Sequence, residues 1–145
     1  MQTVTTDIAV AGGGFTGVAA ALAAARQGAR VILMEQSGCL GGAASNNLVN
    51  PFMRYWTEKD GKKTILCGGI FAEIVQRLKE MNAMEPPLRF HEEYLKVLLD
   101  RMLAEEGVQV LFHVALAKTI LEQQKITQVM LTCKSGSISV AADQF

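Results

Sequence analysis

The sequence predicts an α/β protein in which a parallel sheet is followed by a β-meander. Residues 7–35 run in the order apolar stretch, glycine-rich turn, small-residue helix and second apolar stretch, which is the order of a βαβ unit. Two helical patterns then precede a third apolar stretch, and three short β segments joined by tight polar turns follow. The chain has 145 residues, of which 50% are hydrophobic and 19% charged, so it can form one domain with its own core.

The βαβ unit has a glycine motif at its first turn. The predicted strand 8–11 leads into Gly12, Gly14 and Gly17 with the spacing G-x-G-x-x-G, and then into the predicted helix 18–27. In this motif the first glycine permits a tight turn, the second lets a diphosphate approach the backbone, and the third brings the helix close to the sheet. The helix N-terminus adds N–H groups. The motif predicts a Rossmann-like dinucleotide site; a glycine-rich turn without nucleotide is the alternative.

The second predicted strand, 31–34, ends in Glu35. An acid at this place can accept hydrogen bonds from the ribose of an adenosine. Because its carboxylate would repel a 2′-phosphate, the sequence disfavours NADP. Gly28, between the helix and this strand, is placed where a helix C-terminal turn is expected.

A loop with one short helix is expected after Glu35, and it contains the sequence L-G-G-A-A-S with Gly41 and Gly42. Together with D-I-A-V-A-G-G-G-F-T-G and Glu35, this segment resembles the FAD-dependent oxidoreductases of the glutathione-reductase-like superfamily. Within that superfamily, the closest likeness is to the family related to succinate dehydrogenase and fumarate reductase flavoproteins. Many NAD-binding Rossmann domains lack the L-G-G segment, which favours FAD over NAD. An NAD-dependent Rossmann domain is the competing enzymatic hypothesis.

The resemblance implies a role for each part of the motif. The three motif glycines face the FAD diphosphate, Glu35 holds the ribose, Gly41 and Gly42 help to seat the flavin half, and the backbone of residues 114–116 lies against the adenine. For the glycine pair a flexible loop is the alternative. The candidate cofactor-binding residues are Gly12, Gly14, Phe15, Thr16, Gly17, Glu35, Gln36, Gly41, Gly42 and Leu116.

The remainder of the chain completes the predicted fold. Amphipathic helices are expected at 69–81 and 91–105, a third parallel strand at 108–113, and a strand order of three, two, one. The meander is expected at 117–121, 126–133 and 137–142, and residues 140–145 resemble the approach to one more central strand. In the resembled family a second flavin contact and a substrate domain follow. We therefore expect residues 1–145 to be an incomplete FAD-binding domain without a substrate domain.

No side chain is predicted to be catalytic. His91 and His113 lie at the ends of predicted elements, where a surface histidine is the simplest interpretation. The aromatic residues Phe52, Tyr55 and Trp56 are expected to pack a long loop onto the body rather than to contact substrate. Because a flavin itself provides the redox chemistry, the lack of a catalytic dyad does not contradict the resemblance.

Composition excludes several other classes of function. The 14 basic and 14 acidic residues balance and form no basic face, which argues against nucleic-acid binding. The three cysteines are widely spaced and have no C-x-x-C motif, so we expect a reducing, cytoplasmic setting. Asp7 and the central glycines interrupt the apolar N-terminal region, so no membrane span is expected. A non-catalytic remnant that self-associates through an exposed sheet edge is the remaining alternative.

Overall fold

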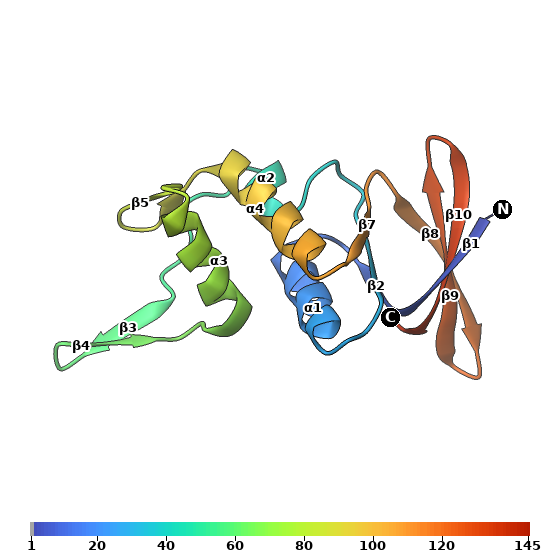
Figure 1. Ribbon diagram of the computed structural model, residues 1–145, viewed down its shortest axis with the longest axis horizontal. Helices are drawn as coiled ribbons and strands as arrows, with labels where there is room; N and C mark the ends of the chain where they lie inside the picture. The colour runs from blue at the N-terminus through green and yellow to red at the C-terminus, as the bar shows by residue number, and fades with distance from the viewer. Residues whose placement is uncertain (1) are drawn as a thin grey trace.

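The computed structural model describes residues 2–145, and its elements form three layers (Figure 1). A six-stranded sheet has the order β7-β2-β1-β10-β9-β8. Helices cover one face of its parallel strands, and the antiparallel strands β8, β9 and β10 fold over the other face. The sheet strands are β1 (Gln2–Ala11), β2 (Val31–Met34), β7 (Gln109–Leu111), β8 (Ala115–Glu122), β9 (Lys125–Cys133) and β10 (Gly136–Gln144).

The central strands confirm the predicted order three, two, one. Strand β2 pairs in parallel with β1 on one side and with β7 on the other, so that Leu33 lies opposite both Val10 and Val110. All four residues of β2 are buried, with Leu33 in the core under the helices and Ile32 in the core under the meander. A strand buried on both faces is read from the sequence as a continuous apolar run, which is why it was predictable.

Strand β1 is longer than predicted, because it begins at Gln2 rather than at residue 8. Its first half is mostly polar, with Val4 the one apolar residue among residues 2–7, and it pairs in parallel with β10, with Val4 opposite Val140. Strand β10 also pairs antiparallel with β9, with Val140 opposite Val129. Residues 140–144, which were expected to approach a separate central strand, are thus part of a strand that closes the meander and extends the parallel sheet.

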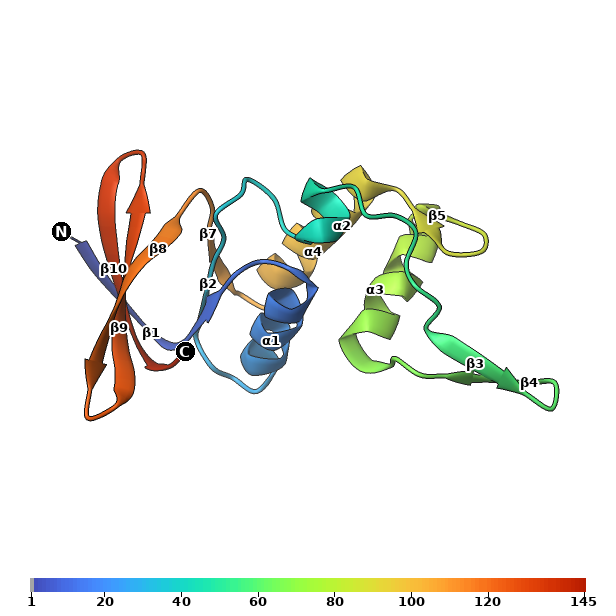
Figure 2. The same ribbon diagram turned by 180° about the vertical axis from the view of Figure 1, so that it is seen from behind.

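The helices agree with the prediction except at their ends. Helix α1 (Phe15–Arg26) begins at the glycine motif, three residues before the predicted start at 18, and Gly28 with φ +87° ends it as expected. Helices α3 (Gly69–Glu80) and α4 (Glu92–Glu105) match the predicted 69–81 and 91–105 to within one residue at each end. The loop after β2 contains the expected short helix, α2 (Ala43–Asn46), which packs on α4 (Figures 1 and 2).

The prediction missed two small hairpins. Strands β3 (Trp56–Lys59) and β4 (Lys62–Ile65) join at Asp60 and Gly61, both with positive φ, a combination that favours a tight hairpin turn. Figure 2 shows this hairpin projecting at the end of the molecule opposite the meander. Strands β5 (Met84–Glu85) and β6 (Arg89–Phe90) form the second hairpin.

The aromatic loop packs as expected. Phe52 is buried and stacks on Phe90 at a centroid distance of 4.2 Å, with Phe15 and Phe71 edge-on at 5.7 and 5.3 Å. Tyr55 extends this aromatic group onto Phe71. Within residues 2–145, no helix has the length and apolar character needed to cross a bilayer.

An ion-pair network holds the three long helices together on their outer side. Arg26 of α1 donates to both carboxylate oxygens of Glu73 on α3, at 2.8 and 3.0 Å, and to Glu106 after α4 at 2.8 Å. Arg77 of α3 contacts Glu73 at 3.0 Å and Glu105 of α4 at 2.6 Å. The hydrogen bond from Arg26 is the largest cause of the lowered pKa of Glu73.

We predict that Glu73→Gln lowers the free energy of unfolding by about 0.5–1 kcal/mol at neutral pH, the scale of a partly exposed ion pair. Because the folded-state pKa of Glu73 lies below its ordinary value of 4.5, the contribution of the network is complete above that pH. It is lost as the pH falls through the lower, folded-state pKa. Urea denaturation across this pH range should show that the free energy of unfolding of the wild type decreases on acidification. The decrease should be smaller in the variant. Glu80→Gln, on the exposed side of α3, is the control. It should change neither the free energy of unfolding nor its dependence on pH.

Candidate functional site

The glycine turn is tied to the end of β2. The N–H of Gly12, whose φ is +101°, donates to the carbonyl of Met34 at 2.7 Å. A Cβ atom on Gly17 would lie 1.8 Å from the carbonyl oxygen of Gly12, so only glycine allows α1 to begin this close to the turn. This is the close helix packing that the sequence predicted for Gly17.

The carboxylate of Glu35 accepts hydrogen bonds from two different segments of the chain. Its Oε2 accepts the N–H of Gly13 at 2.6 Å, and its Oε1 accepts the N–H of Ser37 at 2.7 Å. The residue is only 7% exposed, so the carboxylate is held in one position. A carboxylate has about four lone-pair sites. These backbone N–H groups occupy two of them.

The charge state of Glu35 follows from these contacts. Burial alone would raise the pKa of Glu35, but the hydrogen bonds from Ser37 and from the N–H of Gly13 outweigh it and hold the pKa below its ordinary value. The residue is therefore an anion at neutral pH. An anion at this place accepts hydroxyl donors and repels a phosphate.

The N-terminus of α1 opens beside this carboxylate. Gly14 is the N-cap residue, with φ −68° and no side chain to cap the helix, and the first hydrogen bond within the helix runs from the N–H of Val18 to the carbonyl of Gly14. The N–H groups of Phe15, Thr16 and Gly17 thus have no carbonyl one turn earlier in the helix to bond to. A Cβ atom on Gly14 would meet nothing within 4 Å, so the space in front of the turn is open.

The L-G-G segment lies directly on the glycine turn. The N–H of Gly41, whose φ is +101°, donates to the carbonyl of Gly13 at 2.8 Å. A Cβ atom on Gly42 would come within 3.0 Å of the Cα atom of Gly14. Two glycine segments far apart in the sequence are therefore in backbone contact, and the flexible-loop alternative does not describe this pair.

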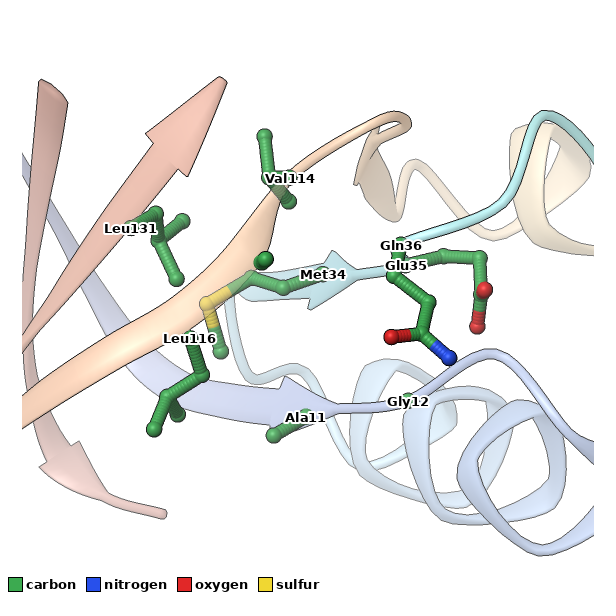
Figure 3. A pocket seen from close by; sticks show the side chains of 9 residues that line it. Ala11, Gly12, Met34, Glu35, Gln36, Val114, Leu116 and Leu131 are labelled. Carbon is green, nitrogen blue, oxygen red and sulfur yellow. The ribbon is translucent and has the colours of Figure 1, made fainter. Parts of the chain in front are cut away.

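A cavity of about 160 Å³ continues the site on the other side of Glu35 (Figure 3). It lies between the ends of β1 and β2 and the start of β8. In Figure 3 the Gln36 amide points toward Gly12, and Leu116 lies across from Met34. The cavity is lined by Ala11, Gly12, Met34, Glu35, Gln36, Val114, Ala115, Leu116 and Leu131. Its walls are thus mostly apolar, with polar groups at one end.

Comparison with known proteins identifies the group to which this arrangement belongs. Residues 7–145 match the model of the family described as FAD dependent oxidoreductase. The chain belongs to this family. No curated protein matches the sequence closely enough to serve as a relative.

Several solved structures share the fold of this chain. Over 99% of the chain, it superimposes with a TM-score of 0.69 and 16% identity on 3-ketosteroid-delta4-(5alpha)-dehydrogenase from Rhodococcus jostii RHA1. L-proline dehydrogenase from P. horikoshii gives 0.61 and 18% over 98% of the chain, and Thermovibrio ammonificans THI4 gives 0.61 and 18% over 95%. The chain spans only 45%, 22% and 55% of these three structures, in that order. At such identities the likeness shows the fold.

The structure brings the candidate residues of this FAD dependent oxidoreductase family member together along one edge of the sheet. Gly12, Glu35, Gln36 and Leu116 line the cavity, whereas Gly14, Thr16 and Gly17 lie at the start of α1. The ring of Phe15 packs on Phe52 and Phe71, so only its backbone N–H is available to a ligand.

Sequence reasoning missed two backbone donors of this site, Gly13 and Ser37. A Cβ atom on Gly13 would lie 2.6 Å from Leu40 Cδ2 and 3.1 Å from Glu35 Oε2. The middle residue of the G-G-G run must therefore be glycine for Glu35 and Leu40 to pack against it. The run of three glycines was the available signal. Nothing in the sequence indicated Ser37, because its role depends on the turn that follows β2.

The two histidines take no part in the site. His91 precedes α4 and is exposed, as the sequence suggested. His113 is also exposed, but it lies two residues after β7, because the third parallel strand spans Gln109–Leu111 rather than the predicted 108–113. Within residues 2–145, no three His, Cys, Asp or Glu side chains gather as they would to hold a metal ion.

We predict that Glu35→Gln lowers the free energy of unfolding by about 1–3 kcal/mol, the scale of a lost hydrogen bond to a buried charged group. The amide has one acceptor oxygen, so its NH₂ group must face the N–H of either Gly13 or Ser37. Urea denaturation measures this loss. Glu58→Gln, at an exposed position on β3, is the matched control and should stay within about 0.5 kcal/mol of the wild type. Equal stability of the Glu35 variant and the wild type would contradict the clamping role of the carboxylate.

Proposed function

We propose that this chain binds FAD and is the cofactor-binding part of a flavin-dependent oxidoreductase. The observation that supports this most directly is the position of Glu35. Its buried carboxylate is fixed by Gly13 and Ser37 between an apolar cavity on one side and the open N-terminus of α1 on the other. A dinucleotide needs these three surroundings in this order, for its base, its ribose and its diphosphate.

The residues present fit the cofactor. The cavity with Leu116 and Gln36 accepts the adenine, and the remaining lone pairs of Glu35 accept the ribose hydroxyls. The N–H groups at the start of α1 bind the diphosphate, which approaches the backbone at Gly14 because no side chain fills the space there. When bound, FAD supplies the capacity for hydride or electron transfer. The part of this chain is to hold and orient it.

FAD is favoured over NAD by the contact between the two glycine segments. The N–H of Gly41 donates to the carbonyl of Gly13, so the L-G-G segment lies against the diphosphate turn. The part of the cofactor beyond the diphosphate would thus meet this segment, which is the segment that distinguishes the resembled flavoproteins. NADP is disfavoured because the anionic Glu35 would repel its 2′-phosphate.

We also place the protein in the cytoplasm. Cys39, Cys67 and Cys133 are all free thiols, which suits a reducing compartment.

The visible spectrum and nucleotide titrations of the purified chain test the proposed function. Flavin absorbance that co-purifies, or saturable uptake of added FAD that is tighter than binding of NADH, is the expected result. Tighter binding of NADH would instead identify an NAD-binding domain. A folded protein that takes up neither nucleotide would contradict cofactor binding by this chain.

We predict that Gly14→Val abolishes FAD binding while the protein remains folded. Gly14 has φ −68°, which valine adopts, and a Cβ atom there meets no protein atom within 4 Å, so the cost falls on the ligand. Isothermal titration with FAD should show no saturable binding, because the branched side chain occupies the space that the diphosphate needs. Circular dichroism and urea denaturation check the fold. Retained affinity would rule out approach of the diphosphate at Gly14.

A further inference from the structure

A second cavity lies among the β3–β4 hairpin, α3 and the β5–β6 hairpin, and it shares no lining residue with the cavity beside Glu35. Its volume is about 240 Å³. Figure 2 shows these three elements at the end of the molecule opposite the meander. Aromatic rings separate this cavity from the glycine turn, because Tyr55 in its wall packs on Phe71 at a centroid distance of 5.2 Å and Phe71 packs on Phe15 at 6.3 Å. It is therefore a separate candidate site.

The charged side chains of this cavity favour an anion. Lys63 of β4 and Lys79 in the last turn of α3 line it, and Glu85 of β5 is the acidic residue of the lining. Two ammonium groups and one carboxylate give a net charge of +1. Within residues 2–145, neither lysine forms an ion pair. A concave surface with unpaired cations attracts anions, and a single negative charge balances this one.

The ammonium group of Lys63 is held in place by aromatic contacts. Its Nζ lies 3.8 Å from the centroid of the Trp56 ring, a cation–π contact, although the residue opposite Lys63 in the hairpin is Glu58. Trp56 packs edge-on against Tyr55 at 4.9 Å, and Tyr55 packs on Phe71 of α3. The cation thus lies on an aromatic group that is fixed to α3, which lowers the entropy lost when a ligand binds it.

The other walls of the cavity are apolar. Tyr55 and Met84 are half-buried, and the rings of Pro86 and Pro87 complete the lining. Proline loses no side-chain rotamer freedom when it is covered, so contact with these rings carries little entropic cost. Apolar and aromatic walls with a few polar groups are typical of sites for small organic molecules. The lining therefore suits a ligand that has an apolar part as well as a charge.

We propose that this cavity binds a small, flat organic monoanion of the aromatic carboxylate class. The carboxylate lies between Lys63 and Lys79, and the ring lies against Tyr55 and the two prolines. Glu85 disfavours a second negative charge, so a phosphate monoester should bind less well than a carboxylate. The inference does not rest on the proposed function, because the cavity has no residue in common with the candidate cofactor site.

Benzoate is the probe, and Trp56 is the reporter, because it is the sole tryptophan of the chain. Titration with benzoate should change the Trp56 fluorescence saturably, and isothermal titration should give the same affinity. Benzamide has the ring without the charge, and acetate has the charge without the ring. Each should bind at least about tenfold more weakly than benzoate, the scale of losing a charged contact or a buried ring.

Neutral variants of the two lysines test where the anion lies. Lys63→Gln and Lys79→Gln should each weaken benzoate binding by at least about threefold, and together by about tenfold or more, while benzamide binding stays within about twofold. Lys62→Gln is the matched control. Lys62 precedes Lys63 on β4 and points to the opposite face of the hairpin, and it does not line the cavity. This variant should leave benzoate binding unchanged, and the urea midpoints of all three variants should equal that of the wild type.

Glu85→Gln tests the charge balance from the other side. Removal of this carboxylate should strengthen benzoate binding and increase the affinity for phenyl phosphate, which carries two negative charges. Benzoate binding that neither fluorescence nor isothermal titration detects in the wild type would overturn the proposal. So would equal binding of benzoate and benzamide, or an equal effect of Lys62→Gln and Lys63→Gln. FAD titration of the same variants should give the wild-type result, which keeps this test separate from that of the proposed function.

Discussion

The candidate site depends on the carboxylate of Glu35. One oxygen bonds the N–H of Gly13 and the other bonds the N–H of Ser37, so a single side chain connects the end of β2 to the glycine turn and to the loop that follows. The glycine turn also contacts the L-G-G segment, because the carbonyl of Gly13 accepts the N–H of Gly41. Burial by itself would favour a neutral carboxyl group, and the backbone donors reverse that preference. The same contacts that stabilise the turn therefore keep Glu35 anionic.

The pairing of the sheet strands shapes the surroundings of Glu35. Strand β10 pairs with β1 on one side and β9 on the other, which folds the meander over the parallel strands and buries Ile32, Val129 and Val140 together. The end of β1 and the end of β2 are then covered by Leu116 and Leu131, whose side chains close the cavity beside Glu35. A meander that paired differently would leave this end of the sheet open. The cavity beside Glu35 is thus a product of the long-range pairing of β1 and β10.

The sequence predicted those parts of the molecule whose signals are local. The glycine spacing, the acid at the end of β2 and the strand order all followed from patterns within a few tens of residues, and the family assignment confirms the interpretation of the motif. The first half of β1 was not predicted, because residues 2–7 are stabilised by pairing with β10, more than 130 positions away in the sequence. Ser37 was not predicted for a related reason, since a backbone donor has no residue type to identify it, whereas for Gly13 the G-G-G run was a signal that the prediction did not use. The Asp60–Gly61 hairpin, by contrast, had a local signal, an Asp-Gly pair, from which no hairpin was predicted.

The cavity beside Glu35 and the loop after α2 are built in different ways. The cavity is formed by strand ends and by residues of a packed core, so its shape is fixed by the fold. The loop after α2 carries Leu48 and Val49, whose side chains are largely in solvent. Binding to a preformed cavity requires little ordering, whereas covering an exposed apolar surface adds a hydrophobic contribution only when a suitable group is present. A ligand should therefore enter the cavity beside Glu35 without rearrangement of the sheet.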